Sequence, residues 1–223
     1  MSAFFITGTD TEIGKTFTTC ALLHAARASG LTAVGYKPIA AGAEETAEGL
    51  ANEDALALRA AGSAGFALTE INPLCLREAV APHIAAAAEG IALEVEPIVA
   101  GFERLAARAD LVLVEGVGGF RVPLTDTLDT ADLAAALGLP VLLVVGMRLG
   151  CINHALLTVE AIGARGLTLA GWYANTPSAR MSRFDENLAA LEARIAAPLL
   201  GVLPHCAAGP AEAAAMVRLP QRV

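Results

Sequence analysis

The chain has 223 residues, 55% of them hydrophobic and 17% charged, and its formal net charge is −8 at pH 7. This length suits one α/β domain over residues 1–223, and the high apolar fraction argues against disorder. No basic stripe is available for a phosphate backbone, so we expect no nucleic-acid partner. A nucleotide can still bind where backbone amides, single lysines and a metal ion create a local positive field.

Cysteine usage and the apolar stretches together predict a cytoplasmic protein. No pair among Cys20, Cys75, Cys151 and Cys206 has C-x-x-C spacing, so neither a zinc site nor a thioredoxin-like site is indicated. Residues 1–6 lead into a glycine motif without a charged segment, which is not the pattern of a signal peptide. Gly, Pro or charged residues interrupt every long apolar stretch, so we expect no membrane span.

Short apolar runs alternate with alanine-rich helical patterns along the chain. The runs at 111–114 and 141–145 are continuous rather than alternating, which is typical of strands buried on both faces. The order predicts an α/β, P-loop NTPase-like fold with a mostly parallel sheet and helices on both faces. Strands are expected at 3–7, 32–36, 111–115, 141–145, 169–174 and 199–203, and helices at 15–29, 53–61, 97–109, 129–137, 152–165 and 183–196.

The first predicted strand runs into a glycine-containing loop, Gly8-Thr9-Asp10-Thr11-Glu12-Ile13-Gly14-Lys15-Thr16. Glycines allow the backbone to approach phosphate, and the free N–H groups at the following helix start favour anions. In such a loop Lys15 reaches the β- and γ-phosphates, and the Thr16 hydroxyl binds magnesium. Five residues separate Gly8 from Gly14 instead of four, so this is a lengthened variant. A plain strand–helix turn would not explain Gly-Lys-Thr at a helix start.

The second predicted strand ends at Tyr36-Lys37-Pro38, where the proline stops the strand. Ligands of this fold class bind beyond the carboxyl ends of the strands, so Lys37 is predicted to point into the ligand crevice. The alternative is a solvated lysine at the sheet edge. The segment from about 40 to 95 is less regular, and we expect helical insertions over that edge.

Two acidic positions are candidate magnesium ligands. Glu115 follows the strand 111–114 and precedes a glycine-rich stretch, which is the Walker B position, from which a carboxylate holds the ion directly or through water. The alternative is an ordinary turn glutamate. Asp54 lies in Asn52-Glu53-Asp54 before a helix, where the residues alone favour a helix cap over a metal ligand.

Gly150-Cys151-Ile152-Asn153-His154 follows the strand 141–145 and starts a helix. Free amides at such a start can bind a carboxylate, although a plain strand–helix loop explains the pattern equally well. The histidines have no metal-binding spacing, and we assign them no catalytic role.

In this order, the motifs resemble the dethiobiotin synthase family from residue 3 to about 215. The most specific matches are the Gly8-Thr9-Asp10-Thr11 opening and the string from Gly150 to His154. Others are Tyr36-Lys37-Pro38, Asn52-Glu53-Asp54, Val114-Glu115-Gly116-Val117-Gly118-Gly119 and Gly171-Trp172-Tyr173-Ala174-Asn175.

The resemblance implies a cytoplasmic ligase of biotin biosynthesis that joins 7,8-diaminopelargonic acid, CO2 and ATP into dethiobiotin, ADP and phosphate. It also implies a homodimer with shared active sites. Lys15 and Lys37 would be catalytic, and Thr16, Asp54 and Glu115 would hold Mg2+. The implied ATP contacts are Glu12, Ile13, Gly14, Lys15, Thr16, Phe17, Asp54, Glu115, Asn175, Pro204, His205 and Cys206, and the implied substrate contacts are Thr11, Lys37, Ala41, Val117, Gly118, Gly150, Cys151 and Asn153.

One position departs from the family pattern. The family often has a substrate-binding serine where this chain has Ala41. A backbone amide or water could replace that hydroxyl, at a loss of about 1 kcal/mol.

Other functions fit the loop less well. A partitioning or switch-type ATPase is the main alternative, but many of these carry a second lysine early in the loop, where this chain has Thr9, Asp10 and Thr11. A GTPase lacks support because no Asn-Lys-x-Asp string occurs, and an amidating relative in cofactor biosynthesis would need a glutaminase domain for which 223 residues leave no room.

Overall fold

The protein is described by a computed structural model covering residues 1–47, 49–178, 181–205 and 209–220. Its centre is a six-stranded sheet with the strand order β10-β9-β8-β1-β7-β2. All neighbouring strands of this sheet are parallel. The strands are β1 (Ser2–Gly8), β2 (Ala33–Tyr36), β7 (Leu111–Glu115), β8 (Val141–Gly146), β9 (Leu169–Asn175) and β10 (Leu199–Leu203). All six lie where the sequence predicts them.

The strand register determines which loops meet at the carboxyl edge of the sheet. Ile6 of β1 pairs with Glu115 of β7, and Tyr36 of β2 pairs with Val114 of β7. Lys37 therefore leaves the sheet beside Glu115, and the loop after Gly8 begins at the same edge. Three of the motifs that carry chemistry in the sequence are brought together by parallel pairing alone.

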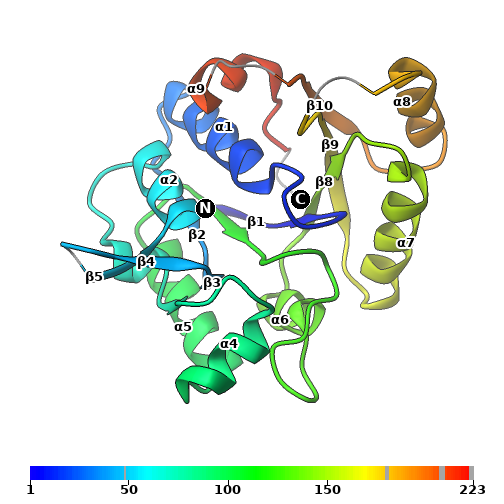
Figure 1. Ribbon diagram of the computed structural model, residues 1–223. Helices are drawn as coiled ribbons and strands as arrows, with labels where there is room; N and C mark the ends of the chain where they lie inside the picture. Colours follow the sequence, from blue (N-terminus) through cyan, green and yellow to red (C-terminus); the bar gives the residue numbers. More distant parts are fainter. Residues whose placement is uncertain (48, 179–180, 206–208, 221–223) are drawn as a thin grey trace.

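Helices cover both faces of the sheet (Figure 1). Helices α1, α2 and α9 lie on one side of β1, and α5 and α6 lie on the other, while α7 and α8 flank β8 and β9. Their bounds are α1 (Lys15–Ala28), α2 (Glu53–Ala61), α5 (Val95–Ala106), α6 (Thr130–Leu137), α7 (Cys151–Ala164), α8 (Phe184–Glu192) and α9 (Pro210–Ala213), the last followed by a 3₁₀ turn at Ala214–Met216. The predicted helices are confirmed; α9 and the turn after it were not predicted.

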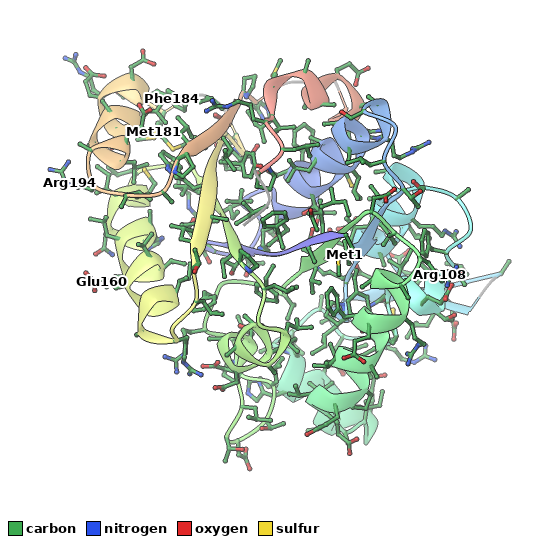
Figure 2. The ribbon with its side chains drawn as sticks, turned by 180° about the vertical axis from the view of Figure 1, so that it is seen from behind. Met1, Arg108, Glu160, Met181, Phe184 and Arg194 are labelled. Carbon is green, nitrogen blue, oxygen red and sulfur yellow. The ribbon has the colours of Figure 1, made fainter. Side chains whose placement is uncertain are left out.

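Alternate residues of β8 enter separate hydrophobic clusters. Leu142 and Val144 pack in the large central core, whereas Leu143 and Val145 pack with α7 and α8. Figure 2 shows Met181 and Phe184 beside β10 at the α8 end of the molecule, with Arg194 and Glu160 farther out. Burial on both faces explains the unbroken apolar run of this strand.

The segment after β2 differs from the prediction. It contains the expected helical insertions, α3 (Leu68–Ile71) and α4 (Pro82–Glu89), but also two small sheets that were not predicted. β3 (Ile39–Ala41) pairs parallel with β6 (Leu74–Leu76), and β4 (Ala43–Thr46) forms a hairpin with β5 (Gly49–Asn52). These strands are three or four residues long and poor in β-branched residues, so they lack the usual sequence pattern of a strand.

No helix in the described part of the chain is long and apolar enough to cross a membrane. The thiols of Cys20, Cys75 and Cys151 are free. The cytoplasmic location itself stays a prediction.

Candidate active site

A cavity of about 780 Å3 opens at the carboxyl ends of β1, β2 and β7. The chain has only two lysines, Lys15 and Lys37, and both line this cavity. A protein with an excess of acidic residues thus keeps both of its lysine side chains at one site. Other predicted residues in the lining are Thr11, Glu12, Gly14, Thr16, Ala41, Asp54, Val117 and Gly118.

The loop between β1 and α1 has the backbone shape of an anion-binding turn. Gly14 has φ 86° and Glu12 has φ 56°, both in the left-handed region. Gly14 caps α1 without a side-chain hydrogen bond, so backbone amides of the first helical turn remain available to a ligand. Lys15 Nζ donates to the Asp10 carbonyl at 2.9 Å, which places the ammonium across the loop.

Ile13 and Asn175 hold the loop on the side that faces the core. Ile13 is fully buried, and Asn175 Nδ2 donates to its carbonyl at 2.7 Å. A Cβ on Gly14 would lie 2.1 Å from Asn175 Nδ2, so only glycine fits there. Because the Ile13 side chain faces the core, only its backbone can contact a nucleotide.

Lys37 lies between two carboxylates. Its Nζ is 3.0 Å from Asp54 Oδ2 and 2.7 Å from Glu115 Oε1. Glu115 has no exposed surface, and it also accepts hydrogen bonds of 2.7 Å from the hydroxyls of Thr16 and Thr19. The solvated-edge reading of Lys37 and the turn reading of Glu115 are both wrong, because each side chain is buried in this network.

Asp54 is not the cap of α2. The cap is Asn52, whose Oδ1 accepts from the Asp54 N–H at 3.0 Å. The Asp54 carboxylate is therefore directed to Lys37. The helix cap predicted for this stretch is confirmed at Asn52 and not at Asp54.

Burial and charge shift the ionisation of the site. Burial, together with the nearby Lys37 charge, lowers the pKa of Lys15 to about 8. Burial alone would also lower the pKa of Lys37, but Glu115 and Asp54 outweigh it and raise that pKa above its ordinary value. Burial works against the Asp54 carboxylate too, yet the Lys37 ammonium holds the pKa of Asp54 below its usual range. Lys37 is therefore charged at neutral pH.

The α3–β6 segment holds the Lys37 backbone. The Lys37 N–H donates to the Ile71 carbonyl at 2.8 Å, and Asn72 Nδ2 donates to the Lys37 carbonyl at 2.6 Å. Both backbone groups of Lys37 are thus satisfied outside the central sheet, which leaves the side chain free to enter the cavity. The role of Asn72 was missed in the sequence because only tertiary folding brings it to Lys37.

A second cavity of about 190 Å3 lies on the other side of the loop. Of the predicted nucleotide contacts, its lining includes Glu12, Gly14, Phe17, Asn175, Pro204 and His205, and Thr176 and Pro177 complete it. Cys206, the remaining predicted contact, lies outside the described residues.

The far wall of the large cavity was not predicted. It is formed by Ala79, Val80, Ala81 and Pro82 at the start of α4. These side chains are small or apolar and carry no recognisable chemistry, so only their position in the fold places them at the site.

The predicted contacts at the start of α7 line neither cavity of this chain. Cys151 has a buried side chain, and its N–H donates to the Arg148 carbonyl at 2.9 Å. We expected this amide to be free, but in the structure it is already hydrogen-bonded. Asn153 is exposed, and no described residue accepts from its N–H. Gly150 precedes them with φ 97°.

The oxygen atoms near Lys37 fit a hard divalent cation. Thr16, Asp54 and Glu115 converge there, and Asp54 and Glu115 already surround one positive charge. The described residues contain no group of three or more His, Cys, Asp or Glu side chains placed to hold a metal. A site with two carboxylates and a hydroxyl suits Mg2+, which takes few protein ligands and completes its shell with water and phosphate.

Comparison with known proteins gives a consistent result. A family model described as "AAA domain" matches residues 2–209. The chain is 66% identical over 219 residues to "ATP-dependent dethiobiotin synthetase BioD" of Aromatoleum aromaticum, covering 98% of this chain and 97% of the relative. It is 55% identical over 221 residues to the protein of the same name in Pseudomonas paraeruginosa, with the same coverage of each chain.

Solved structures resemble this one in fold alone. The MinD cell division protein of Aquifex aeolicus superposes with a TM-score of 0.57 at 13% identity, covering 92% of this chain and 83% of that one. The cell division protein FtsY of Thermotoga maritima gives a TM-score of 0.50 at 14% identity, with 90% and 60% coverage. Both confirm the α/β, P-loop NTPase-like class and carry no argument about activity.

Proposed function

The chain belongs to the ATP-dependent dethiobiotin synthetase family, and from this premise we propose which substrates, metal and residues its site uses. It is an ATP-dependent ligase of biotin biosynthesis. Its proposed substrates are 7,8-diaminopelargonic acid and CO2, with Mg2+ as the metal, and residues 1–223 are proposed to act as one domain.

The observation that carries this proposal is that both lysines and two carboxylates lie at one sheet edge. Lys15 and Lys37 line the same cavity, and Lys37 contacts Asp54 and Glu115. Phosphoryl transfer mainly requires positioning and neutralisation of negative charge, and this arrangement provides both. The cavity volume of about 780 Å3 is in the range of small-molecule sites.

The proposed reaction uses the two amines in turn. One amine adds to CO2 and loses a proton, giving a carbamate. A carbamate oxygen attacks the γ-phosphorus of ATP, and ADP leaves. The second amine attacks the carbonyl carbon of the mixed anhydride, phosphate leaves, and a second proton is lost as the cyclic urea closes. Lys37 stabilises the carbamate and the transferring phosphoryl group, and Lys15 stabilises the β- and γ-phosphates.

Thr16, Asp54 and Glu115 are the proposed Mg2+ ligands. When bound, the ion supplies positive charge against the phosphate oxygens. The Thr16 hydroxyl lies 2.7 Å from Glu115 Oε1, and Asp54 Oδ2 and Glu115 Oε1 both contact Lys37 Nζ, which supports a shared site. Glu115 is fully buried beside Thr16 and Lys37, and its proposed role is to hold the ion directly or through a water molecule.

Asp54→Asn should raise the Mg2+ concentration needed for half-maximal activity by about tenfold, because a neutral amide is a poorer ligand for a hard cation. Glu115→Gln should act in the same direction. The measurement is a Mg2+ titration at fixed ATP. The control is Glu96→Gln, which neutralises the second residue of α5 as Asp54→Asn does for α2, but far from the cavity. A wild-type titration curve for Asp54→Asn would remove Asp54 from the metal site.

The nucleotide base is proposed to enter the smaller cavity. That cavity adjoins the loop that holds the phosphates, and the two cavities share Glu12 and Gly14 in their linings. Asn175 supplies an amide group beside the base, while Phe17, Pro204 and His205 flank it. Cys206 keeps its predicted base contact as part of this proposal. Thr11, Ala41, Val117 and Gly118 face the diamine in the larger cavity.

A homodimer is proposed to complete the substrate site. The start of α7 lies outside both cavities, so its amides at Gly150, Cys151 and Asn153 would act on a second chain. Leu149, which precedes α7, is 93% exposed, and Leu157 within α7 is 57% exposed, which supports burial of this surface against another copy. The helix start would bind the aliphatic carboxylate of the diamine.

Mixing two inactive variants tests the shared site. Lys37→Ala and Asn153→Trp, once each is shown to be inactive, should together recover roughly a quarter of wild-type activity, because random exchange makes half the dimers mixed and each mixed dimer has one intact site. Activity is followed after subunit exchange has been verified by mass spectrometry. No recovery despite exchange would leave the ATP chemistry untouched but remove the shared site.

ATP turnover separates this proposal from a partitioning ATPase. ADP release should require both the diamine and bicarbonate, since the γ-phosphoryl acceptor forms from them. ATP hydrolysis that continues unchanged without the diamine would instead favour the partitioning class. The sequence already argues against that class, because the loop has Thr9, Asp10 and Thr11 where many of its members have a second lysine.

A further inference from the structure

Asn52 is a buried polar residue that the proposed chemistry does not use. It is the last residue of β5 and directly precedes α2, and its exposed surface is only 5%. It borders the large cavity next to Asp54. A buried side-chain amide must form hydrogen bonds with both of its ends, so the partners of each end indicate what the residue does.

The nitrogen end holds the part of the cavity lining formed by Ala41 and Gly42, which we call the substrate wall. Asn52 Nδ2 donates to the carbonyls of Ala41 at 3.1 Å and Gly42 at 3.0 Å. Gly42 has φ 81°, and its N–H donates to the Glu78 carbonyl at 3.0 Å. The chain turns sharply here between β3 and β4, and the Asn52 amide fixes that turn from inside.

The oxygen end holds the proposed metal ligand. Asn52 Oδ1 accepts from the Asp54 N–H at 3.0 Å and thereby caps α2. This bond sets the first turn of the helix, and so the direction of the Asp54 carboxylate toward Thr16 and Lys37.

The hydrogen bonds of Asn52 Nδ2 matter in this chain because position 41 is alanine. Alanine offers the substrate no hydroxyl, so the wall at Ala41 and Gly42 can contribute only its shape and backbone. A recognition surface made of backbone depends on how firmly that backbone is held.

We propose that Asn52 is a positioning residue with two separable roles: its Nδ2 sets the substrate wall at Ala41 and Gly42, and its Oδ1 sets the Asp54 carboxylate. The proposal rests on the proposed function, because it assigns the two ends of one amide to the diamine and to the metal. Asn52 itself contacts neither reacting group.

Two substitutions separate the two roles. Serine is a good helix cap, but its side chain is too short to reach the carbonyls of Ala41 and Gly42. Asn52→Ser should therefore keep the hydrogen bond from the Asp54 N–H and lose the two hydrogen bonds to these carbonyls. Asn52→Ala should lose the hydrogen bonds at both ends of the side chain. The control is Tyr173→Phe, which removes one partly buried hydrogen bond of 2.9 Å, to the Arg218 carbonyl, away from the larger cavity.

The readouts are the KM for the diamine at saturating ATP, and calorimetric binding of a nonhydrolysable ATP analogue at stepped Mg2+ concentrations. Asn52→Ser should raise the KM about tenfold and leave the Mg2+ dependence of binding unchanged. Asn52→Ala should raise the KM similarly and also raise the Mg2+ requirement several-fold. Tyr173→Phe should lower Tm and change neither readout.

Each departure from this pattern overturns the proposal. If Asn52→Ala lowers Tm but moves neither readout, Asn52 is only structural. If Asn52→Ser moves the Mg2+ requirement as much as Asn52→Ala does, the two roles are not separable. A wild-type chain that makes no dethiobiotin overturns the proposed function and this inference together, whereas an active wild type with either pattern above overturns the inference alone.

Discussion

Lys37→Ala should lower kcat by about 10²–10³-fold, the scale on which loss of one charge-stabilising donor acts in acyl and phosphoryl transfer. Lys37 is the ammonium that contacts Asp54 and Glu115 in the large cavity. Negative charge is redistributed over its proposed targets, the carbamate and the transferring phosphoryl group, in the transition state. The affinity for ATP should change far less than kcat. Steady-state kinetics with ATP and the diamine varied separately measure both.

The same substitution should also destabilise the fold. Glu115 has no exposed surface, and without Lys37 its charge keeps only the Thr16 and Thr19 hydroxyls. Breaking a buried ion pair on one side costs about 3–5 kcal/mol, so Tm must be measured and kinetics recorded well below it. Arg165→Ala is the matched control, because Arg165 also pairs with two carboxylates, those of Asp129 and Asp132, away from the cavity. It should lower Tm while kcat stays near wild type.

A fall in ATP affinity with kcat unchanged would make Lys37 a binding residue only. A fall in kcat that Arg165→Ala reproduces would make the effect a general consequence of lost stability.

Lys15→Ala should reduce kcat/KM for ATP by about 10³-fold or more, because the ammonium acts on phosphate oxygens whose charge is redistributed in the transition state. Unlike Lys37, Lys15 has no carboxylate within ion-pair distance among the described residues, and its Nζ is bonded to the Asp10 carbonyl. Burial lowers its pKa to about 8, so the folded protein gains little from its charge. Tm should therefore stay close to wild type.

Arg27→Ala provides the control on the same helix. Arg27 lies in the last turn of α1 and donates to the Ala61 carbonyl at 3.0 Å, far from the phosphate loop. It should keep wild-type turnover. Near-normal turnover of Lys15→Ala at unchanged Tm would contradict the phosphate-loop interpretation.

The sequence predicts the central sheet well because its strands are buried on both faces. Residues 111–114 and 141–145 are unbroken apolar runs, and both proved to be strands. Lys37 directly follows β2, Glu115 is the last residue of β7, and Lys15 begins α1 after the loop that leaves β1. These positions could be found because parallel strands bring their carboxyl ends together. The residues at this edge of the sheet could therefore be predicted from local sequence patterns.

The segment from 39 to 76 could not be read in the same way. Its strands are three or four residues long, and β3 and β6 pair with each other over more than 30 intervening positions rather than with a neighbour in sequence. The start of α4 lines the cavity with small or apolar side chains that no motif identifies. Asp54 was ambiguous because cap and metal ligand share the same residue types, and only the fold shows that Asn52 makes the cap.

The fold likeness to the MinD cell division protein of Aquifex aeolicus carries no argument about activity, because the two sequences are only 13% identical. The relatives at 55–66% identity over almost the whole chain do decide the family. The two sets of comparisons agree once fold and function are kept apart.

The most direct test of the proposed chemistry is a product assay with 13C-bicarbonate, 7,8-diaminopelargonic acid, ATP and Mg2+, analysed by mass spectrometry. We expect dethiobiotin that carries the label in its ureido carbon, with ADP formed in equal amount and no dethiobiotin formed when ATP is omitted. ADP release without labelled dethiobiotin, or labelled product that forms equally well without ATP, would contradict it.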